Sequence, residues 1–400
     1  MQDAIAIYYF RPRNGTSPEE AARAISEEET TGTWTGITTR AKYVRRLDGQ
    51  VESVDPSGKG YVTRIRYPAE IFEPGNVPQY LSVVAGNLFG LAKLDAVRLL
   101  DIELPDDLVT FNGPKFGIPG VRHIVGTTTR PHVGTIIKPK VGLNPPDTAE
   151  VAYQAAIGGV DLIKDDETLT DQQFCPLAER VPAVMARLDD AREETGHQVL
   201  YAVNVTTRPD RIVDRANEVL SLGANMLMVD IFVAGIGALQ ALAEEPGINV
   251  PIHVHRAMHA AFTRSPEHGI AMRPFARLFR MLGADQLHTG TVSGKMGHRP
   301  EETVGDNQAL REPCCFGLKP TFPVSSGGLH PGKVSKELTI LGSDIVLQAG
   351  GGIHGHPDGT AAGARAMRQA VDAFMSGIAP EEYAKDHFEL ERALKLWGTE

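Results

Sequence analysis

The chain has 400 residues, of which 42% are hydrophobic and 22% are charged. This length suits two domains or one large barrel with an appendage, and the composition is that of an ordinary globular protein, not a disordered one. The formal net charge of -10 argues against a protein that coats nucleic acid or an anionic membrane, because its average field repels both. An anionic substrate therefore needs a local cluster of cations.

Cysteine use and the N-terminus bear on the compartment. The three cysteines are Cys175 and the adjacent pair Cys314 and Cys315. This pattern favours free thiols in a reducing cytosol over disulfides or a structural zinc site. The N-terminus has no basic region followed by an apolar core, and no apolar run approaches the roughly 18 residues of a membrane-spanning helix. We expect a cytoplasmic protein.

Residues 1–125 are expected to form an N-terminal α+β domain. The first helix has a clear start, because Ser17 suits the N-cap, Pro18 the first helical position and Glu20 the third. The order of elements fits a small open sheet with helices on one face. We predict strands at residues 5–10, 33–37, 61–67 and 97–102 and helices at residues 18–28 and 77–85.

Residues 126–400 repeat a pattern of short apolar run, polar tip and helix. The eight runs are residues 133–137, 160–163, 199–205, 226–231, 250–254, 285–287, 321–324 and 344–347. Eight such units predict a TIM barrel. The residues at the C-terminal ends of the runs are Lys138, Lys164, Asn204, Asp230, His255, His288, Ser326 and Gly350. In a barrel all eight ends meet on the catalytic face, whereas a doubly wound open sheet gathers residues from only two or three strands.

A lysine and three consecutive carboxylates follow the second of these runs. They are Lys164, Asp165, Asp166 and Glu167. Carboxylate oxygens are hard ligands, and adjacent carboxylates at a strand end suit an octahedral magnesium site better than a zinc site. A solvated charge run at a strand terminus is the alternative.

Further cations stand at other strand ends. Lys138 and Lys140 follow the first run, where a lysine in a crowded mouth can have a lowered pKa and act as a general base; a pair of surface lysines is the alternative. His255, Arg256 and His259 follow the fifth run and suit an anionic oxygen or a metal. From strand alternation we expect His253 to face away from His255 and to pack between the barrel and its helices.

Glycine-rich turns follow the last two runs. They are residues 325–328, Ser-Ser-Gly-Gly, and residues 350–352, three glycines. Bare backbone N–H groups there can hold phosphate, and the loops after strands seven and eight are the usual phosphate site of a TIM barrel. Tight turns without a ligand are the alternative. Lys295 lies between glycines after the sixth run, as in a mobile lid or a plain surface loop.

Together these segments resemble the large subunit of ribulose-1,5-bisphosphate carboxylase/oxygenase (RuBisCO), and the resemblance covers nearly the whole chain. Its most specific strings are HRAMHAAFTR (255–264), LHTGT (287–291), PVSSGG (323–328) and LQAGGGIHGHPDG (347–359). The nearest type is the archaeal form III enzyme. The resemblance implies a ferredoxin-like N-terminal domain followed by a TIM-barrel catalytic domain. The implied reactions are carboxylation, a lyase-type fixation of carbon dioxide, and oxygenation, a monooxygenase reaction.

The resemblance also implies roles for the lysines and carboxylates. Lys164 would take up an activating CO2 as a carbamate and hold Mg²⁺ together with Asp166 and Glu167, which leaves Asp165 with a structural role. Lys138 would abstract the proton that gives the enediolate, assisted by Lys140 and His255. Lys295 would close over the substrate and orient CO2.

The remaining implied residues bind ribulose 1,5-bisphosphate. Arg256, His288 and Ser326 match the positions that hold one phosphate, and Gly328, Gly350 and Gly351 match those for the other. A second subunit would supply Glu28, Thr33, Trp34 and Asn87. The resemblance therefore implies a homodimer, or a multiple of dimers, with the active site at the subunit interface and without a small subunit. The segment 27–31 departs from the family pattern of glutamate-serine-serine, and the lid reads KMGHRP.

Three other functions are consistent with parts of the pattern. A RuBisCO-like protein would act as an enolase, isomerase or decarboxylase on another sugar phosphate through the same enediolate. A metal-dependent hydrolase on the same barrel is suggested by the H-x-H at residues 253–255, but its family carries this motif on strand one. A non-catalytic sugar-phosphate-binding protein predicts loss of Lys138, Lys164 or Lys295, and all three are present.

Overall fold

The computed structural model describes residues 2–294, 299–313 and 317–399. These residues form two compact units, each of which draws on more than one stretch of the chain. The first lies within Met1–Asn112, Met258–Leu282 and Pro313–Leu318, and the second within Gly113–Ala257, Gly283–Glu312 and Lys319–Glu400. Because the units are not contiguous, they do not test a single boundary after residue 125, which stays a prediction.

The first unit is a five-stranded sheet with the order β10-β4-β1-β3-β2. Its strands are β1 (Ala4–Pro12), β2 (Gln50–Ser57), β3 (Gly60–Tyr67), β4 (Leu94–Glu103) and β10 (Gly269–Ile270). The helices are α1 (Pro18–Glu28), α2 (Val77–Ala85), α9 (Ala260–Thr263) and α10 (Met272–Met281). The predicted start of α1 is confirmed, because the Ser17 side chain accepts a hydrogen bond from the Glu20 N–H.

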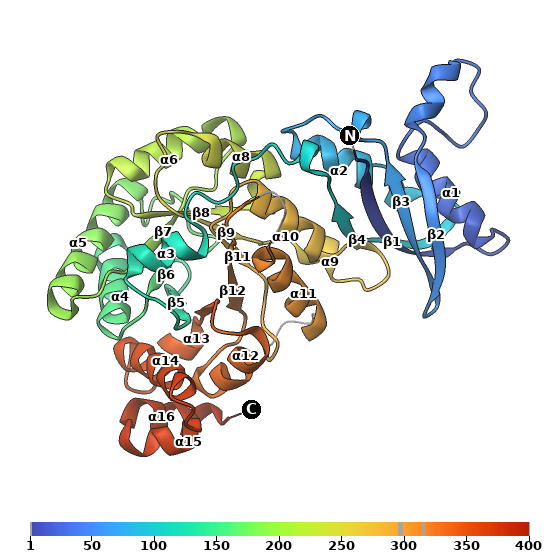
Figure 1. The fold of residues 1–400 in the computed structure, drawn as a ribbon. Coiled ribbons are helices and arrows are strands. Elements are labelled where there is room, and N and C mark those ends of the chain that lie inside the picture. Colours follow the sequence, from blue (N-terminus) through green and yellow to red (C-terminus); the bar gives the residue numbers. More distant parts are fainter. Residues whose placement is uncertain (1, 295–298, 314–316, 400) are drawn as a thin grey trace. The chain divides into compact units, whose positions relative to one another are not determined.

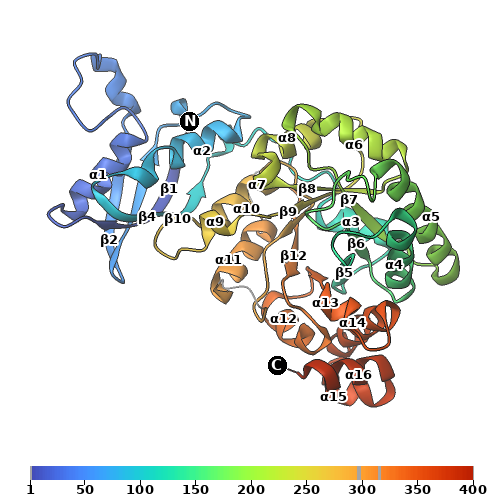
Figure 2. The same cartoon turned by 180° about the vertical axis from the view of Figure 1, so that it is seen from behind.

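One predicted strand of this unit is wrong. Residues 33–37 have no strand conformation, and the second strand of the sheet is β2 at residues 50–57. The aromatic and β-branched residues at 33–37 suggested a strand, but Trp34 is 92% exposed and the segment around it projects away from the sheet in both views (Figures 1 and 2). Strand β2 has a polar sequence with Pro56, which is tolerated because β2 is an edge strand.

The second unit is a closed barrel, as predicted, with parallel strands in the order β11-β12-β13-β5-β6-β7-β8-β9. Its strands are β5 (His132–Ile136), β6 (Leu162–Lys164), β7 (Leu200–Asn204), β8 (Met226–Asp230), β9 (Ile252–His255), β11 (Gln286–His288), β12 (Phe322–Ser326) and β13 (Val346–Gln348). Each of the eight predicted runs overlaps one of these strands, with ends that differ by up to two residues. The connecting helices cover the outside of the barrel (Figure 1). They include α4 (Pro145–Ile157), α5 (Leu177–Thr195), α6 (Ile212–Ser221), α8 (Ile236–Glu244), α11 (Pro300–Arg311), α12 (Val334–Leu341) and α14 (Thr360–Met375).

Helix α3 (Gly117–Val125) closes the N-terminal end of the barrel. Its buried residues Ile118, Val121 and Val125 belong to one apolar cluster with residues near the start of the strands, such as Leu162 and Phe322. Burying such side chains stabilises the unit by about 1.5–3 kcal/mol each. Because this apolar cluster fills the N-terminal end of the barrel, polar side chains can occupy the C-terminal end. Beyond the barrel, α15 (Pro380–Tyr383) and α16 (Phe388–Trp397) lie beside α14 in both views (Figure 2).

A buried carboxylate, Asp161, joins several cations just before β6. It accepts hydrogen bonds from Arg130 (2.7 and 2.8 Å), from Arg368 (2.6 Å) and from the Val133 N–H (2.8 Å), and it pairs with His197 (2.9 Å). Burial alone would raise the pKa of Asp161, but these cations outweigh burial and hold the pKa well below its usual range. The network connects α14 to the strand starts, on the side away from the predicted catalytic ends.

We predict that Asp161→Asn lowers the free energy of unfolding by about 3 kcal/mol, because it leaves partly buried arginines without their anion. Asp189→Asn, which removes an exposed carboxylate on α5, should change it by less than about 0.5 kcal/mol. Denaturant titration measures both. Because the folded-state pKa of Asp161 is depressed, its stabilisation is complete above the unfolded pKa of about 4 and is lost as the pH falls below it. Equal stabilities for the two variants would contradict the assignment.

None of the helices within residues 2–294, 299–313 and 317–399 is long and apolar enough to cross a membrane.

Candidate active site at the C-terminal end of the barrel

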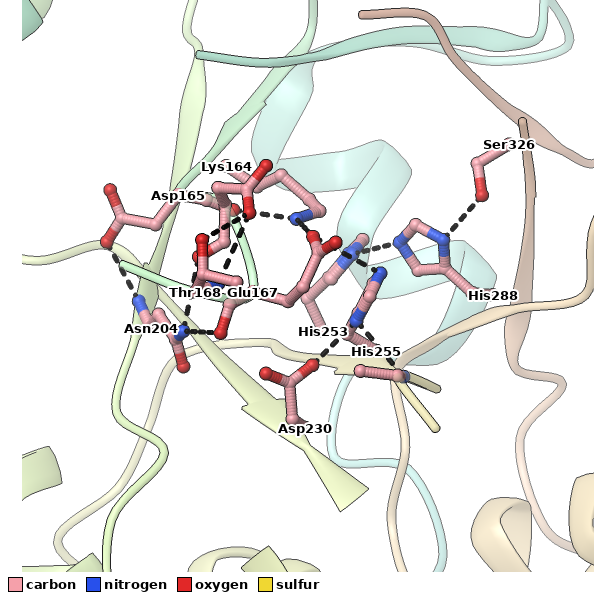
Figure 3. A network of polar contacts seen from close by, with 12 residues as sticks. Lys164, Asp165, Glu167, Thr168, Asn204, Asp230, His253, His255, His288 and Ser326 are labelled. Carbon is pink, nitrogen blue, oxygen red and sulfur yellow. Dashed lines mark hydrogen bonds and ion pairs between the residues drawn. The ribbon is translucent and has the colours of Figure 1, made fainter. Parts of the chain in front are cut away.

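Lys164 ends β6 and its side chain is fully buried at the barrel mouth (Figure 3). Its Nζ donates a hydrogen bond to the Asp165 carbonyl oxygen at 2.6 Å and lies 3.8 Å from Glu167 Oε2. Burial lowers the pKa of the Lys164 ammonium, although the nearby carboxylates of Glu167, Asp166 and Asp230 oppose this effect. The site therefore increases the fraction of uncharged amine, which is the nucleophilic form of a lysine.

Lys138 and Asp166 form an ion pair beside Lys164. Lys138 Nζ donates to Asp166 Oδ2 at 2.8 Å, and Asp166 Oδ1 accepts hydrogen bonds from the N–H and hydroxyl of Thr168. Burial would raise the pKa of Asp166, but Lys138 and Thr168 together lower it. The pair holds Asp166 ionised and brings a lysine from β5 against the acidic cluster that follows β6.

Asp165 turns away from this cluster into a second, fully buried network. Its carboxylate accepts hydrogen bonds from the Tyr201 hydroxyl at 2.6 Å, from Arg180 at 3.2 Å and from the Asn204 N–H at 3.0 Å. The Asn204 side chain in turn donates to the carbonyl oxygens of Asp166 and Glu167. This network fixes the backbone that carries the acidic residues. Tyr201 and Arg180 carried no sequence signal, because neither lies at a strand end.

Three histidines lie together on the opposite side of the mouth, which corrects the prediction for His253. The His253 ring is buried inside the barrel, with Nε2 at 2.7 Å from His288 Nε2 and Nδ1 at 2.7 Å from Gln286 Oε1. The ring of His255 packs edge-on against that of His288, with centroids 4.6 Å apart. The expectation was wrong because residues two apart on a strand share a face.

Hydrogen bonding orders the rings of His253 and His288 into a chain that ends at Ser326 (Figure 3). Burial lowers the pKa of His253 to about 3 and that of His288 well below its usual value, so both rings are neutral at pH 7. Because Gln286 Oε1 can only accept, His253 donates from Nδ1 and accepts at Nε2 from His288. His288 Nδ1 then accepts from the Ser326 hydroxyl at 2.7 Å. The orientation of Ser326 is therefore set from Gln286, three hydrogen bonds away.

His255 is held between two acidic residues. Its Nδ1 lies 2.6 Å from Asp230 Oδ1, and its Nε2 lies 3.8 Å from Glu167 Oε2. Asp230 is buried and stands at the end of β8. This arrangement orients the imidazole toward the acidic cluster, as a general acid or base requires.

The glycine turns and Arg256 complete the described part of the mouth. A Cβ atom at Gly350 would lie 3.3 Å from Lys138 Cε, so the glycine after β13 makes room for the lysine after β5. Gly328 has φ of 83°, a conformation that favours glycine, and Gly351 is exposed. Arg256 is 8% exposed, and burial lowers its pKa to about 10. It keeps its charge at neutral pH.

Two predicted lysines lie apart from these contacts. Lys140 is exposed, and its ammonium has no hydrogen bond or ion pair within the described residues. Lys295 lies outside the described residues, so its predicted position over the substrate stays a prediction.

A buried carboxylate that the sequence did not reveal anchors the chain after β11. Glu337 of α12 accepts hydrogen bonds from the N–H groups of Val292 (3.0 Å) and Ser293 (2.8 Å). It also accepts from the hydroxyls of Ser293 (2.7 Å) and Ser325 (2.9 Å). Glu337 is fully buried. It therefore ties residues 292 and 293 to the end of β12.

Glu337→Gln should release this tie, because an amide places a donor against four donors and removes a charge. We expect a loss of about 1.5–3 kcal/mol in the free energy of unfolding, the value of hydrogen bonds to a charged group. Hydrogen–deuterium exchange of residues 289–294 should accelerate. The matched control is Glu301→Gln at the exposed start of α11, which should leave both quantities unchanged. Equal exchange in the two variants would show that Glu337 does not anchor this segment.

The other predicted substrate residues lie in the first unit. Glu28 ends α1, Thr33 and Trp34 follow in the exposed segment, and Asn87 stands just after α2. Trp34, Thr33 and Asn87 are exposed and Glu28 is half-buried. A Trp side chain that is 92% exposed is unusual in a monomer and is typical of a residue that a partner covers.

Comparison with known proteins identifies the family of these two units. Residues 117–397 match the family model for the ribulose bisphosphate carboxylase large chain, catalytic domain, and residues 1–108 match that for its N-terminal domain. The chain belongs to the RuBisCO large-chain family.

Relatives match over nearly the whole chain. The ribulose bisphosphate carboxylase of Pyrococcus furiosus is 44% identical over 398 residues, covering 99% of this chain and 94% of that protein. The crystal structure of the octameric RuBisCO of Pyrococcus horikoshii, in complex with sulfate, has a TM-score of 0.94 at 43% identity and covers 99% and 94% of the two chains. The dimeric archaeal RuBisCO of Hyperthermus butylicus has a TM-score of 0.90 at 39% identity, with coverage of 99% and 96%. These RuBisCO relatives agree with the form III resemblance.

Proposed function

We propose that this chain carboxylates ribulose 1,5-bisphosphate to 3-phosphoglycerate through an enediolate, with oxygenation as a competing reaction. The observation that carries the proposal is the meeting of Lys164, Asp166 and Glu167 with Lys138 at one barrel mouth. A buried lysine with a lowered pKa, two carboxylates and a second lysine are what proton abstraction beside a metal requires. The identity to named carboxylases over nearly the full chain supports the choice of substrate.

The donors at this mouth fit a magnesium ion if Lys164 is carbamylated. Among the described residues, no group of three or more His, Cys, Asp or Glu side chains is arranged to hold a metal. Asp166 and Glu167 supply two hard oxygen ligands, and Lys164 would supply the third as a carbamate formed with CO2. Bound there, Mg²⁺ would polarise the oxygens of the substrate and stabilise developing negative charge. Carbamylation would also relieve the burial of a cation that this site disfavours.

The chain's own residues have distinct parts in the reaction. Lys138, in its uncharged form, removes the proton that yields the enediolate, and its hydrogen bond to Asp166 orients Nζ toward the acidic cluster. His255, oriented by Asp230, exchanges protons with the substrate oxygens, with Lys140 assisting. Arg256 and Ser326 donate to one phosphate at a site that His288 lines, and the Ser326 hydroxyl turns from His288 Nδ1 to the phosphate to do so. The backbone of Gly328, Gly350 and Gly351 holds the other phosphate. Lys295 orients CO2.

We further propose that the functional unit is a dimer, or a multiple of dimers, with active sites between subunits and no small subunit. Glu28, Thr33, Trp34 and Asn87 of one subunit would complete the barrel mouth of its partner. The exposure of Trp34 and the dimeric and octameric assemblies of the two RuBisCO relatives support this arrangement.

Product formation tests the reaction itself. The purified chain, given ribulose 1,5-bisphosphate, CO2 and Mg²⁺, should release 3-phosphoglycerate, and omission of any one component should stop the release. Consumption of the bisphosphate without 3-phosphoglycerate would favour an enolase or isomerase reaction of a RuBisCO-like protein instead.

Co-expression of two inactive variants tests the shared site. Asn87→Ala disables the N-terminal contribution and Lys164→Ala disables the barrel, so each variant alone should be inactive. A mixed dimer would contain one site built from two intact halves, and random pairing should restore about a quarter of wild-type activity. Differently tagged subunits allow the mixed dimer to be purified and assayed. A mixed dimer without activity would show that each site is completed within one subunit.

A further inference from the structure

Glu29 directly follows α1, and its carboxyl group is buried inside the first unit. Only 8% of the residue is exposed, although it adjoins the half-buried Glu28, which we place in substrate binding. Its backbone N–H closes the helix by donating to the Ile25 carbonyl oxygen at 3.2 Å. The side chain is thus directed inward from a fixed helix end, and it plays no part in the proposed chemistry.

The partner of this carboxylate is the end of α2. Glu29 Oε2 accepts a hydrogen bond from the Gly86 N–H at 3.0 Å, across 57 positions in the chain. Gly86 ends α2 and immediately precedes Asn87, a second residue that we place in substrate binding. A Cβ atom at Gly86 would lie 2.5 Å from the Ser82 carbonyl oxygen and 3.3 Å from Glu29 Oε2, so glycine permits this approach. The side chain of Glu29, which follows Glu28, is therefore hydrogen-bonded to Gly86, which precedes Asn87.

The surroundings of Glu29 are apolar or neutral. The buried hydroxyls of Tyr8 on β1 and Tyr67 on β3 face it, but they bond to each other at 3.0 Å, and Tyr8 donates to the Val84 carbonyl oxygen. Burial raises the pKa of both tyrosines, so they stay protonated. Among the described residues, no group donates a hydrogen bond to Glu29 Oε1. The acidic neighbour that acts on its pKa is Glu28.

Burial raises the pKa of Glu29 to about 7, against the opposing effects of the Gly86 and Leu88 amides and with a small addition from Glu28. Within the described part of the chain, the Gly86 N–H is the group that donates a hydrogen bond to this carboxylate. Glu29 therefore changes charge near neutral pH. Its ionised form accepts the stronger hydrogen bond, since charge-assisted bonds are about twice as strong as neutral ones.

We propose that Glu29 is a positioning residue for substrate binding: its carboxylate ties Gly86 to the end of α1 and so sets the spacing between Glu28 and Asn87. The proposal rests on the proposed function, which makes Glu28 and Asn87 substrate contacts. The tie strengthens as Glu29 loses its proton. Substrate affinity should therefore increase as the pH rises through neutrality. The group responsible, Glu29, lies outside the barrel mouth.

Two variants separate the hydrogen bond from the charge. Glu29→Ala removes both, and we expect the KM for ribulose 1,5-bisphosphate to rise about fivefold, the effect of one ordinary hydrogen bond, with kcat within about twofold. Glu29→Gln keeps an acceptor for Gly86 but cannot ionise. Its KM should match that of wild type one pH unit below the pKa of about 7, where Glu29 is also neutral, and should lack the fall in KM that wild type shows one unit above. The matched control, Glu19→Gln, removes an exposed acid from the same helix and should retain the wild-type profile.

The outcomes separate this proposal from the proposed function. A wild-type KM in Glu29→Ala, or a wild-type pH dependence of KM in Glu29→Gln, would overturn the positioning role. If Glu29→Ala does not fold, the Glu29→Gln comparison decides. If the wild-type chain forms no 3-phosphoglycerate, the proposed function fails. Hydrogen–deuterium exchange of residues 85–90 then tests whether Glu29 holds Gly86 at the end of α1. Faster exchange in Glu29→Ala than in Glu19→Gln supports the tie, and equal exchange refutes it.

Discussion

Lys164→Ala should abolish carboxylation, with kcat reduced by about 10⁴-fold or more, because the loss of a metal's charge stabilisation costs several kcal/mol and each 1.4 kcal/mol is about tenfold. The variant removes the nitrogen that would carry the carbamate and leaves Asp166 and Glu167 without the cation that now lies 3.8 Å from Glu167. Steady-state assays with saturating Mg²⁺ and CO2 measure the effect.

The buried position of Lys164 also predicts how activation depends on pH. Only the uncharged amine reacts with CO2, and burial lowers the pKa of Lys164. The rate of activation during preincubation with CO2 and Mg²⁺ should therefore rise with pH and level off below the value of about 10.4 for an ordinary lysine. Lys164→Glu is the informative control, since it provides an oxygen ligand without CO2 and should lose the requirement for preincubation. Full activity in Lys164→Ala would rule out a carbamate at this position.

Lys138→Ala should lower kcat by about 10³-fold, within the range typical of a lost general base. Lys138 Nζ lies 2.8 Å from Asp166 and beside Gly350, so the variant removes the amine that we propose as the base while the barrel backbone remains. Exchange of the substrate's C3 hydrogen with solvent reports enolisation separately from carboxylation, and we expect both to fall together.

Matched variants separate the base from a general effect of charge. Lys140→Ala removes the exposed residue two positions after Lys138 and should reduce kcat far less, because in the proposed reaction Lys140 assists and does not abstract the proton. Binding of Mg²⁺, followed by calorimetry, should survive in Lys138→Ala and fail in Lys164→Ala. Normal hydrogen exchange at C3 in Lys138→Ala would assign the base to another residue.

The barrel and its catalytic end were predictable because the sequence repeats one local pattern eight times. Each apolar run ends in a polar residue or glycine, and parallel strands bring those ends together whatever the loops between them do. Lys164, Asp230, His255 and Ser326 therefore meet as expected. The edge strand β2 was missed for the opposite reason, since its polar residues and Pro56 carry no such signal.

The supporting networks could not be predicted, because their partners are chosen by tertiary packing. Asp165 meets Tyr201 and Arg180 only once β6 pairs with β7 and α5 packs beside them. Glu337 reaches Val292 across 45 positions, and Glu29 reaches Gly86 across 57. Nothing in the local sequence of these acids distinguishes them from solvated charges. The error at His253 was different in kind, because correct strand geometry would have placed it beside His255.

Isotope incorporation tests the central claim most directly. Wild-type protein supplied with ¹³C-labelled CO2, Mg²⁺ and ribulose 1,5-bisphosphate should yield 3-phosphoglycerate in which one of every two molecules carries the label in its carboxyl group. Lys164→Ala protein should yield none. Conversion of the bisphosphate by wild-type protein to products without the label, or to no product above the Lys164→Ala level, would contradict carboxylation at this site.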